Sequence, residues 1–463
     1  MTLHASAIAF LPAHKLAAEI NSGTVTTELV AEAFLARIKR YPQLHAFSAV
    51  YSDEIRAAAA AADQAIRSGH RVSHLHGIPV AVKDIIDIEG RVTTGGSLIW
   101  ANRVAPKTAT LVRHMIAAGM IVLGKTHTVE FAMGSFGTNR HMGTPWNPWD
   151  MQNHRIPGGS SSGSAVSVAA GLAPWAIGTD TGGSIRLPAA FCGLVGLKTT
   201  IGRISCAGVL PLSTTLDTPG PICRDVEDAA LLYDVLRGRV VANQSCDPCE
   251  NRRWKKGVAG LRLARMPETE RAVVESSVLE AYDASLKLLA ERGAIIVDIS
   301  LPQSFSEMGE LVGRIMGAEG YSFIGQLVDD ESLPLDDDVR PRIQVGRDMS
   351  ARDYLMLLRE QRNAKLAFGT AMADIDALLT PTTATTAPLV HSVDQSGTMA
   401  HFTRPVNLVE GCALALPNGF TAEGLPTSLQ IICRGNEEEI ALRIGWALEQ
   451  AADWHQRTPP DLD

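Results

Sequence analysis

The sequence is poor in cysteine and has no excess of positive charge. Seven cysteines are spread over 463 residues, and this sparse, odd set favours free thiols in a reducing compartment over a disulfide framework. Lys and Arg together number 42 against 50 Asp and Glu, so the formal net charge is −8. An acidic chain of this kind lacks the basic surface with which proteins bind nucleic acid.

Long apolar runs are also missing. The longest candidate, residues 165–178, is shorter than the roughly 18 residues of a membrane span and is broken by Gly171 and Pro174. Residues 1–20 lack the basic start and apolar core of a secretion signal. We therefore expect a cytoplasmic protein that does not span a membrane.

The chain does have the composition of a globular protein. Hydrophobic residues make up 46% and charged residues 20% of the 463 residues. We find no internal repeat, heptad run or linker, so one large domain over residues 1–463 is the simplest division.

Short buried-strand patterns alternate with helical patterns, which is typical of an α/β layer with parallel strands. Within the domain we distinguish a helical N-terminal part, a core rich in motifs and a variable helical part, at residues 1–70, 77–220 and about 304–373. The expected strands lie at residues 77–84, 120–123, 175–177, 261–263, 295–297, 377–379 and 429–432. The expected helices lie at residues 11–68, 110–118, 164–170, 270–292 and 436–452.

Two segments rich in serine and glycine carry the strongest chemical signal. They are Pro157–Ser164 and Gly178–Pro188, and their serines Ser160 and Ser184 are 24 residues apart. Glycines allow a backbone to turn so that several N–H groups point into one space, as an oxyanion hole requires. The run Thr181–Ser184 could supply such donors beside a serine hydroxyl.

A nucleophilic serine needs a base, and neither segment contains a histidine. Lys83 ends an apolar run, where a lysine is seldom found unless it is paired or functional. Burial can lower the pKa of a lysine by about 3 units, and a neutral amine is a competent base. On a strand, Asp84 would point to the opposite face and leave Lys83 unpaired by it.

These residues lie within a longer pattern that resembles the amidase signature family, also called Ser-cisSer-Lys amidases. The matching stretches begin at Gly77 and Lys83 and extend over nearly the whole chain. They are Gly77–Val80 with Lys83-Asp84, Pro157–Ser164, Gly178–Pro188, Phe191–Thr199 and Pro417–Gln430. The resemblance implies one α/β domain with a central mixed β-sheet covered by helices on both faces.

The resemblance also assigns roles to residues. Ser184 matches the nucleophile, Ser160 the bridging serine that follows a cis peptide bond, and Lys83 the base. The remaining matches are the oxyanion hole, formed by the backbone of Thr181, Gly182, Gly183 and Ser184, and the side chains that brace the nucleophile loop, Asp180 and Arg186. Apart from the resemblance, we expect Ser161 to have a supporting role. Ser162 departs from the family, which commonly has glycine there.

The implied function is hydrolysis of a carboxamide-type C–N bond other than a peptide bond, with release of ammonia or an amine and without a metal or cofactor. The partner would be a small amide-type substrate, whose pocket Met133 and Phe136 could line, and a homodimer stays open. Urea or carbamate bonds would suit the same relay. A glutaminase-type subunit of a tRNA-dependent amidotransferase and a catalytically inactive binding module are the alternatives.

Other patterns give weaker hypotheses. Gly159–Gly163 fits the G-x-S-x-G elbow of α/β-hydrolases, with Ser161 as nucleophile and His391, His401 or His455 as partner, but residues 153–157 make a poor preceding strand. The Gly/Ser run could hold phosphate at a helix start, yet it lacks the Gly-Lys-Ser/Thr ending of a P-loop. Cys246 and Cys249 form a single C-x-x-C, too little for a zinc site.

Overall fold

One mixed sheet organises the computed structural model, which describes residues 5–239 and 253–462. Its strands are β1 (Phe47–Val50), β2 (Pro79–Lys83), β3 (Ile121–Thr126), β4 (Ala176–Asp180), β5 (Val195–Lys198), β6 (Thr218–Cys223), β7 (Arg262–Arg265), β8 (Ile295–Val297), β9 (Ala377–Pro381), β10 (Cys412–Phe420) and β11 (Pro426–Cys433). They pair in the order β1-β3-β2-β4-β6-β5-β10-β11-β9-β7-β8.

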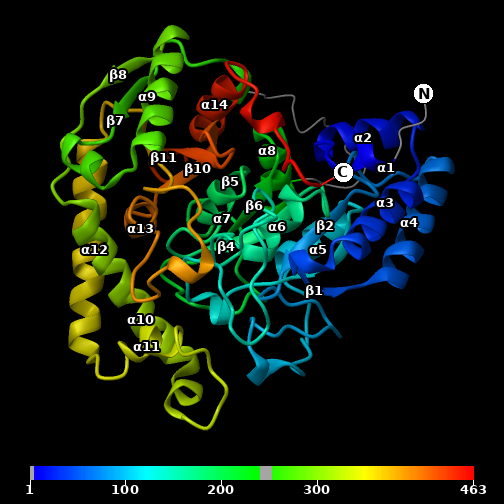
Figure 1. Cartoon of the computed structure of the whole chain (residues 1–463), viewed down its shortest axis with the longest axis horizontal. Helices are drawn as coiled ribbons and strands as arrows, with labels where there is room; N and C mark the ends of the chain where they lie inside the picture. Colours follow the sequence, from blue (N-terminus) through cyan, green and yellow to red (C-terminus); the bar gives the residue numbers. More distant parts are fainter. Residues whose placement is uncertain (1–4, 240–252, 463) are drawn as a thin grey trace.

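Helices flank this sheet (Figure 1). They are α1 (Ala5–Ala9), α2 (Ala13–Ser22), α3 (Thr27–Arg40), α4 (Ser52–Arg67), α5 (Thr110–Ala117), α6 (Ser162–Ala169), α7 (Arg186–Phe191), α8 (Val226–Leu236), α9 (Ser276–Glu291), α10 (Phe305–Asp329), α11 (Arg340–Gln344), α12 (Ala351–Ala371), α13 (Arg404–Leu408) and α14 (Glu438–Glu449). The expected single α/β domain with a mixed sheet is confirmed.

The centre of the sheet places the ends of three strands together. β2 runs parallel to β3 on one side and to β4 on the other. Parallel strands end at the same edge of a sheet, so Lys83 at the end of β2 and Asp180 at the end of β4 lie on the same side. The segment Gly178–Pro188 passes through this edge at the end of β4, and Ser160 of the other segment meets Lys83 there.

Helix α6 owes its position to small side chains. All of its residues are buried, and it packs against β2, β3, β4 and β6. A Cβ at Gly163 would lie 2.3 Å from the carbonyl oxygen of Ala46 and 2.5 Å from the backbone nitrogen of His127. The absence of a side chain at Gly163 therefore lets the start of α6, directly after Ser160, approach the strands closely.

The N-terminal region differs from the expectation of continuous helix over residues 11–68. The short strand β1 interrupts it and pairs antiparallel with β3. Pro42 begins a 3₁₀ turn after α3, and His45 at the end of that turn has a left-handed φ of 48°. The turn ends the helix, and the edge of β3 supplies hydrogen bonds that local helix preference does not outweigh.

Besides β1, three further strands, β5, β6 and β10, were not expected from the sequence pattern. β6 contains Pro219 and Pro221, residues that normally argue against an inner strand. They are two residues apart, so their missing N–H groups fall on the same side of the strand. Gly220 lies between them and pairs with Gly178 in β4.

Neither a membrane span nor the C-x-x-C pair can be located in the part of the chain that the structure describes. Among the described residues, no helix combines the length and the apolar character needed to cross a bilayer. The pair Cys246 and Cys249 lies outside the described residues.

Candidate active site

Lys83 is fully buried at the end of β2. Its Nζ donates to the hydroxyl of Ser160 at 2.8 Å and to the hydroxyl of Thr179 at 2.9 Å. Burial lowers the pKa of the Lys83 amine to about 7, although the charges of Asp217 and Asp180 oppose that shift. An amine with two neutral partners and this pKa is partly uncharged at neutral pH.

Ser160 is fixed by its backbone while its hydroxyl meets Lys83. The peptide bond between Gly159 and Ser160 is cis. The carbonyl oxygen of Ser160 accepts from the hydroxyl of Thr128 at 2.9 Å and from the N–H of Val129 at 3.2 Å. The side chain of Ser160 is fully buried.

Ser184 lies where the buried network reaches a cavity. Its carbonyl oxygen accepts from the N–H of Ser161 at 3.3 Å, which joins the two serine-glycine segments next to Ser160. Ser184 is 9% exposed and lines a cavity of about 40 Å³. Met133 lines the same cavity, whereas Phe136 belongs to a separate apolar cluster with Ile156.

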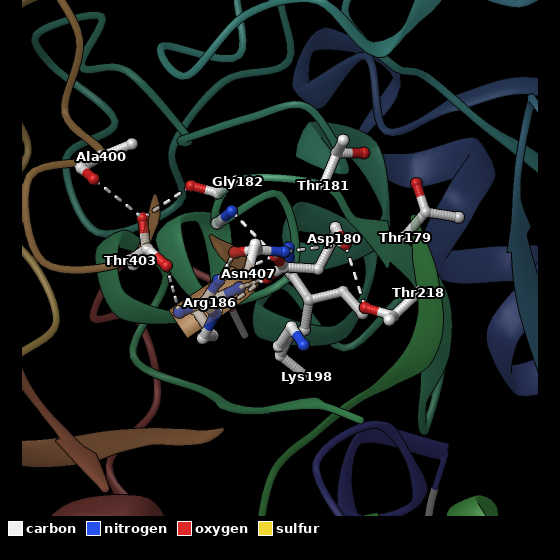
Figure 2. Close-up of polar contacts among 12 residues, drawn as sticks. Thr179, Asp180, Thr181, Gly182, Arg186, Lys198, Thr218, Ala400, Thr403 and Asn407 are labelled. Atoms are coloured by element: carbon white, nitrogen blue, oxygen red, sulfur yellow. Dashed lines mark hydrogen bonds and ion pairs between the residues drawn. The ribbon is translucent and has the colours of Figure 1, made fainter. Parts of the chain in front are cut away.

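A buried ion pair braces the loop that carries Ser184 (Figure 2). The guanidinium of Arg186 donates to the carboxylate of Asp180 at 2.8 Å and 2.9 Å, and both side chains are fully buried. Burial alone would raise the pKa of the Asp180 carboxyl, but the charge and hydrogen bonds of Arg186 hold that pKa well below its usual range. Asn407 also donates to Asp180, at 3.0 Å.

The carboxylate of Asp180 also accepts a hydrogen bond from Gly183, whose N–H was expected to point into the oxyanion hole. The N–H of Gly183 donates to Asp180 Oδ1 at 2.8 Å. The hydroxyl of Thr403 donates to the carbonyl oxygen of Gly182 at 2.8 Å and thus holds that peptide from its other side (Figure 2). The backbone N–H groups of Thr181, Gly182 and Ser184 are therefore the better candidates for an oxyanion.

Asp217 is a second buried carboxylate next to this loop. It accepts from the hydroxyl of Thr181 at 2.5 Å and from the N–H groups of Leu212 and Ser213 at 2.9 Å and 3.0 Å. Burial raises the pKa of Asp217 to about 6 in spite of these hydrogen bonds. The carboxylates of Asp217 and Asp180 both raise the pKa of Lys83, and the effect of Asp217 is the larger.

The structure does not favour Ser161 as the nucleophile of a hydrolase elbow. Ser161 is fully buried, and its hydroxyl both donates to the carbonyl oxygen and accepts from the N–H of Thr179, each at 3.3 Å. No strand directly precedes it within the described residues. Of the proposed histidine partners, His401 pairs instead with Glu270 at 2.7 Å.

Another lysine satisfies a well-known motif without the matching structure. Gly119–Thr126 has the P-loop spacing G-x-x-x-x-G-K-[ST]. Most of this stretch is the buried strand β3 rather than a loop, and Lys125 Nζ contacts the carboxylate of Asp84 at 2.8 Å. Lys125 is already in an ion pair, and the backbone of β3 is hydrogen-bonded to the neighbouring strands. The stretch therefore does not form a phosphate-binding loop.

One cluster within the described residues has the spacing of metal ligands. It consists of His14, Asp225 and Asp228 and shares no residue with the site above. Asp228 accepts from the backbone N–H groups of Ala13 and His14, and Asp225 accepts from the N–H of Asp228 at the start of α8. These hydrogen bonds give both carboxylates a structural role at helix ends.

Thr179, Asp217, Arg342 and Arg404 were missed by sequence reasoning. Arg342 and Arg404 line the cavity together with Ser184, from α11 and α13. Both come from parts of the chain far from the serine-glycine segments, and neither lies in a pattern that indicates a site. Thr179 lies in the segment Gly178–Pro188, but a single threonine in a strand gives no indication that its hydroxyl contacts a catalytic amine.

Comparisons with known proteins identify the family of this chain. A family model described as Amidase matches residues 29–442. A glutamyl-tRNA(Gln) amidotransferase subunit of Chloroflexus aggregans is 36% identical over 469 residues, covering 95% of this chain and 96% of the relative.

Solved structures are similar over the same length. An inhibitor-bound complex of an s-triazine catabolic enzyme has a TM-score of 0.86 and 29% identity, covering 95% of this chain and 98% of that one. The peptide amidase of Stenotrophomonas maltophilia has a TM-score of 0.82 and 27% identity, covering 98% of each chain. The chain therefore belongs to the amidase family, whose members are enzymes that hydrolyse amides.

Proposed function

We propose that this chain hydrolyses a small carboxamide through a relay of Ser184, Ser160 and Lys83 and an acyl-enzyme on Ser184. The observation that carries the proposal is the contact between the Lys83 amine and the Ser160 hydroxyl, with a Lys83 pKa of about 7. The position of Ser184 at the cavity supports its role as the nucleophile.

In the first half-reaction, neutral Lys83 accepts the proton of Ser160, and Ser160 accepts that of Ser184 as Ser184 Oγ bonds to the carbonyl carbon. The developing oxyanion accepts hydrogen bonds from the N–H groups of Thr181, Gly182 and Ser184. The C–N bond breaks as Ser160 returns a proton to the leaving nitrogen. Ammonia or an amine departs and leaves an ester on Ser184.

In the second half-reaction, water attacks the ester while Ser160 and Lys83 accept its proton. The tetrahedral intermediate collapses, the Ser184 oxygen is reprotonated by Ser160, and a carboxylic acid leaves. Urea and carbamate carbonyls fit the same relay, since each presents a carbon that can form the same tetrahedral intermediate. The bond broken is a C–N bond other than a peptide bond.

A second candidate is a glutaminase-type subunit of a tRNA-dependent amidotransferase. The observation that favours it is the name of the relative with 36% identity. A subunit of that kind would depend on partner chains for turnover. Hydrolysis of simple amides by the isolated chain, as a monomer or homodimer, would decide for the free amidohydrolase.

The test combines labelling with turnover. A fluorophosphonate should label wild-type protein at Ser184, and Ser184→Ala should abolish both labelling and ammonia release. Ser161→Ala is the matched control, because its hydroxyl contacts only the backbone of Thr179 in the described residues, and much of the activity should remain. Labelling at Ser161, or full activity of Ser184→Ala, would refute the proposal. An inactive binding module would show no labelling of either serine.

A further inference from the structure

Two guanidinium groups face the cavity that contains Ser184. Arg342 comes from α11 and Arg404 is the first residue of α13. Both line the cavity together with Gly182 and Ser184. None of the described residues that line it is acidic, so two positive charges meet there without a carboxylate.

Arg404 lies directly over the proposed oxyanion loop. A Cβ at Gly182 would be 3.3 Å from Cγ of Arg404 and 3.9 Å from its Nε. Its guanidinium donates to the carbonyl oxygen of Gly309 in α10 at a long 3.4 Å. Burial, together with the like charge of Arg342, lowers the pKa of Arg404 to about 10, so the group is still charged at neutral pH.

Arg342 is held in place by neutral oxygens. It donates to the carbonyl oxygen of Met133 at 3.0 Å, and to the carbonyl oxygen and side-chain oxygen of Gln395. No ion pair of residues 5–239 and 253–462 includes Arg342 or Arg404. Carbonyl groups orient a guanidinium without supplying a negative charge, and the carboxylates of Asp338 and Asp336 act on Arg342 only from beyond ion-pair distance.

We propose that Arg342 and Arg404 form an anion subsite, so that the substrate is a small amide whose acyl part carries a carboxylate. This inference rests on the proposed function and specifies its substrate class. Two guanidinium groups and one carboxylate make a favourable set, because the anion removes the repulsion between the two cations. Arg404 packs against Gly182 in the loop that carries Ser184, so only a few atoms separate the scissile carbonyl from the carboxylate of such a substrate.

The same lining argues against an ammonium group on the substrate. The described residues around the cavity offer no carboxylate to receive one, and both arginines would repel it. Monoamides of short dicarboxylic acids therefore fit better than the amide of a free amino acid. The two arginines would thus favour a carboxylate on the substrate by attraction and exclude an ammonium group by repulsion.

The experiment compares succinamate with butyramide, which has a methyl group in place of the carboxylate, and with glutamine, which adds an ammonium group. For wild-type protein we expect kcat/KM for succinamate to exceed each of the others by about 100-fold or more. Arg404→Met should reduce the preference over butyramide to about threefold, and Arg404→Lys should keep part of it. Arg359→Met, which removes an exposed arginine of α12, is the matched control and should keep the full preference.

A second readout does not require turnover. Millimolar succinate should slow fluorophosphonate labelling of Ser184 in wild-type protein but not in Arg404→Met. Equal turnover of butyramide and succinamate, or labelling that succinate does not slow, would overturn the anion subsite while leaving the relay intact. Absence of any labelling at Ser184 would instead refute the proposed function, so the two failures are distinguishable.

Discussion

Two buried lysines on neighbouring strands show how differently one residue type can be used. Lys83 ends β2, and Lys125 lies one residue before the end of β3. In the parallel register, Lys83 is opposite Thr126 and Lys125 is opposite Val82. The two amines therefore point to opposite faces of the sheet, and both side chains are fully buried.

The partners of the two amines differ in charge. Among residues 5–239 and 253–462, Lys83 donates hydrogen bonds to two hydroxyls only, those of Ser160 and Thr179. Lys125 contacts the carboxylate of Asp84 at 2.8 Å and the hydroxyl of Thr93 at 3.1 Å. Burial lowers the pKa of both amines, but at Lys125 a direct ion pair opposes the shift. Burial alone does not make a base, because the contacting partner decides whether the amine keeps its proton.

The largest expected effect separates the two lysines by activity. Lys83→Met should lower kcat by about 10⁴-fold, because the relay loses its proton acceptor. Lys125→Met should keep turnover per folded molecule within about tenfold, since Lys125 contacts no residue of the relay. Ammonia release, corrected for the folded fraction by circular dichroism, measures both. Equal losses in the two variants would mean that Lys83 acts only through the fold.

The two substitutions should have the opposite order of effect on stability: Lys125→Met should lower the free energy of unfolding more than Lys83→Met. Lys125→Met leaves the buried Asp84 carboxylate without its cation, which typically costs about 3–5 kcal/mol of unfolding free energy. Lys83→Met breaks no direct ion pair and should cost about 1 kcal/mol or less at pH 6, where the wild-type amine must be charged in the interior.

Urea unfolding of both variants provides the measurement. The double variant Lys125→Met with Asp84→Asn should be more stable than Lys125→Met alone, because no unpaired carboxylate remains. A double variant that is less stable than either single variant would contradict the ion-pair explanation.

The sequence pattern predicted the structure correctly where short stretches of chain determine their own conformation. The apolar run before Lys83 predicts a buried strand, and the small residues after Ser160 predict a tightly packed helix. The glycines beside Ser184 predict a turn that exposes N–H groups. These features depend on neighbours in sequence, so β2, α6 and the loop that carries Ser184 could be predicted together with their candidate chemistry.

Features set by distant packing could not be predicted. Arg404 reaches the cavity only because α13 packs beside α10 and the Ser184 loop, and nothing near Arg404 in sequence indicates this. β6 was hidden by Pro219 and Pro221, whose positions in the ladder depend on the register with β4. The P-loop spacing of Gly119–Thr126 shows the converse, because this stretch folds as a buried strand and not as the loop that binds phosphate.

The pH dependence of activity sharpens the comparison further. Only neutral Lys83 can accept a proton, and its pKa is about 7, so kcat/KM should rise between pH 5 and 7 and level off above about pH 8. Well below the pKa of Lys83 the slope should approach tenfold per pH unit. Lys125→Met should keep the same midpoint. A rate that is constant from pH 5 to 10 would rule out Lys83 as the base.

The smallest effect tests whether Asp217 sets the pKa of Lys83. The negative charge of Asp217 favours the protonated amine, so Asp217→Asn should move the midpoint of the pH profile to lower pH. Relative to its own plateau, kcat/KM at pH 6 should then increase by about two- to fivefold. The plateau itself should fall, because an amide cannot accept from Leu212, Ser213 and Thr181 together as the carboxylate does. A purely structural role for Asp217 would lower the plateau and leave the midpoint unchanged, and a midpoint moving to higher pH would contradict the electrostatic role outright.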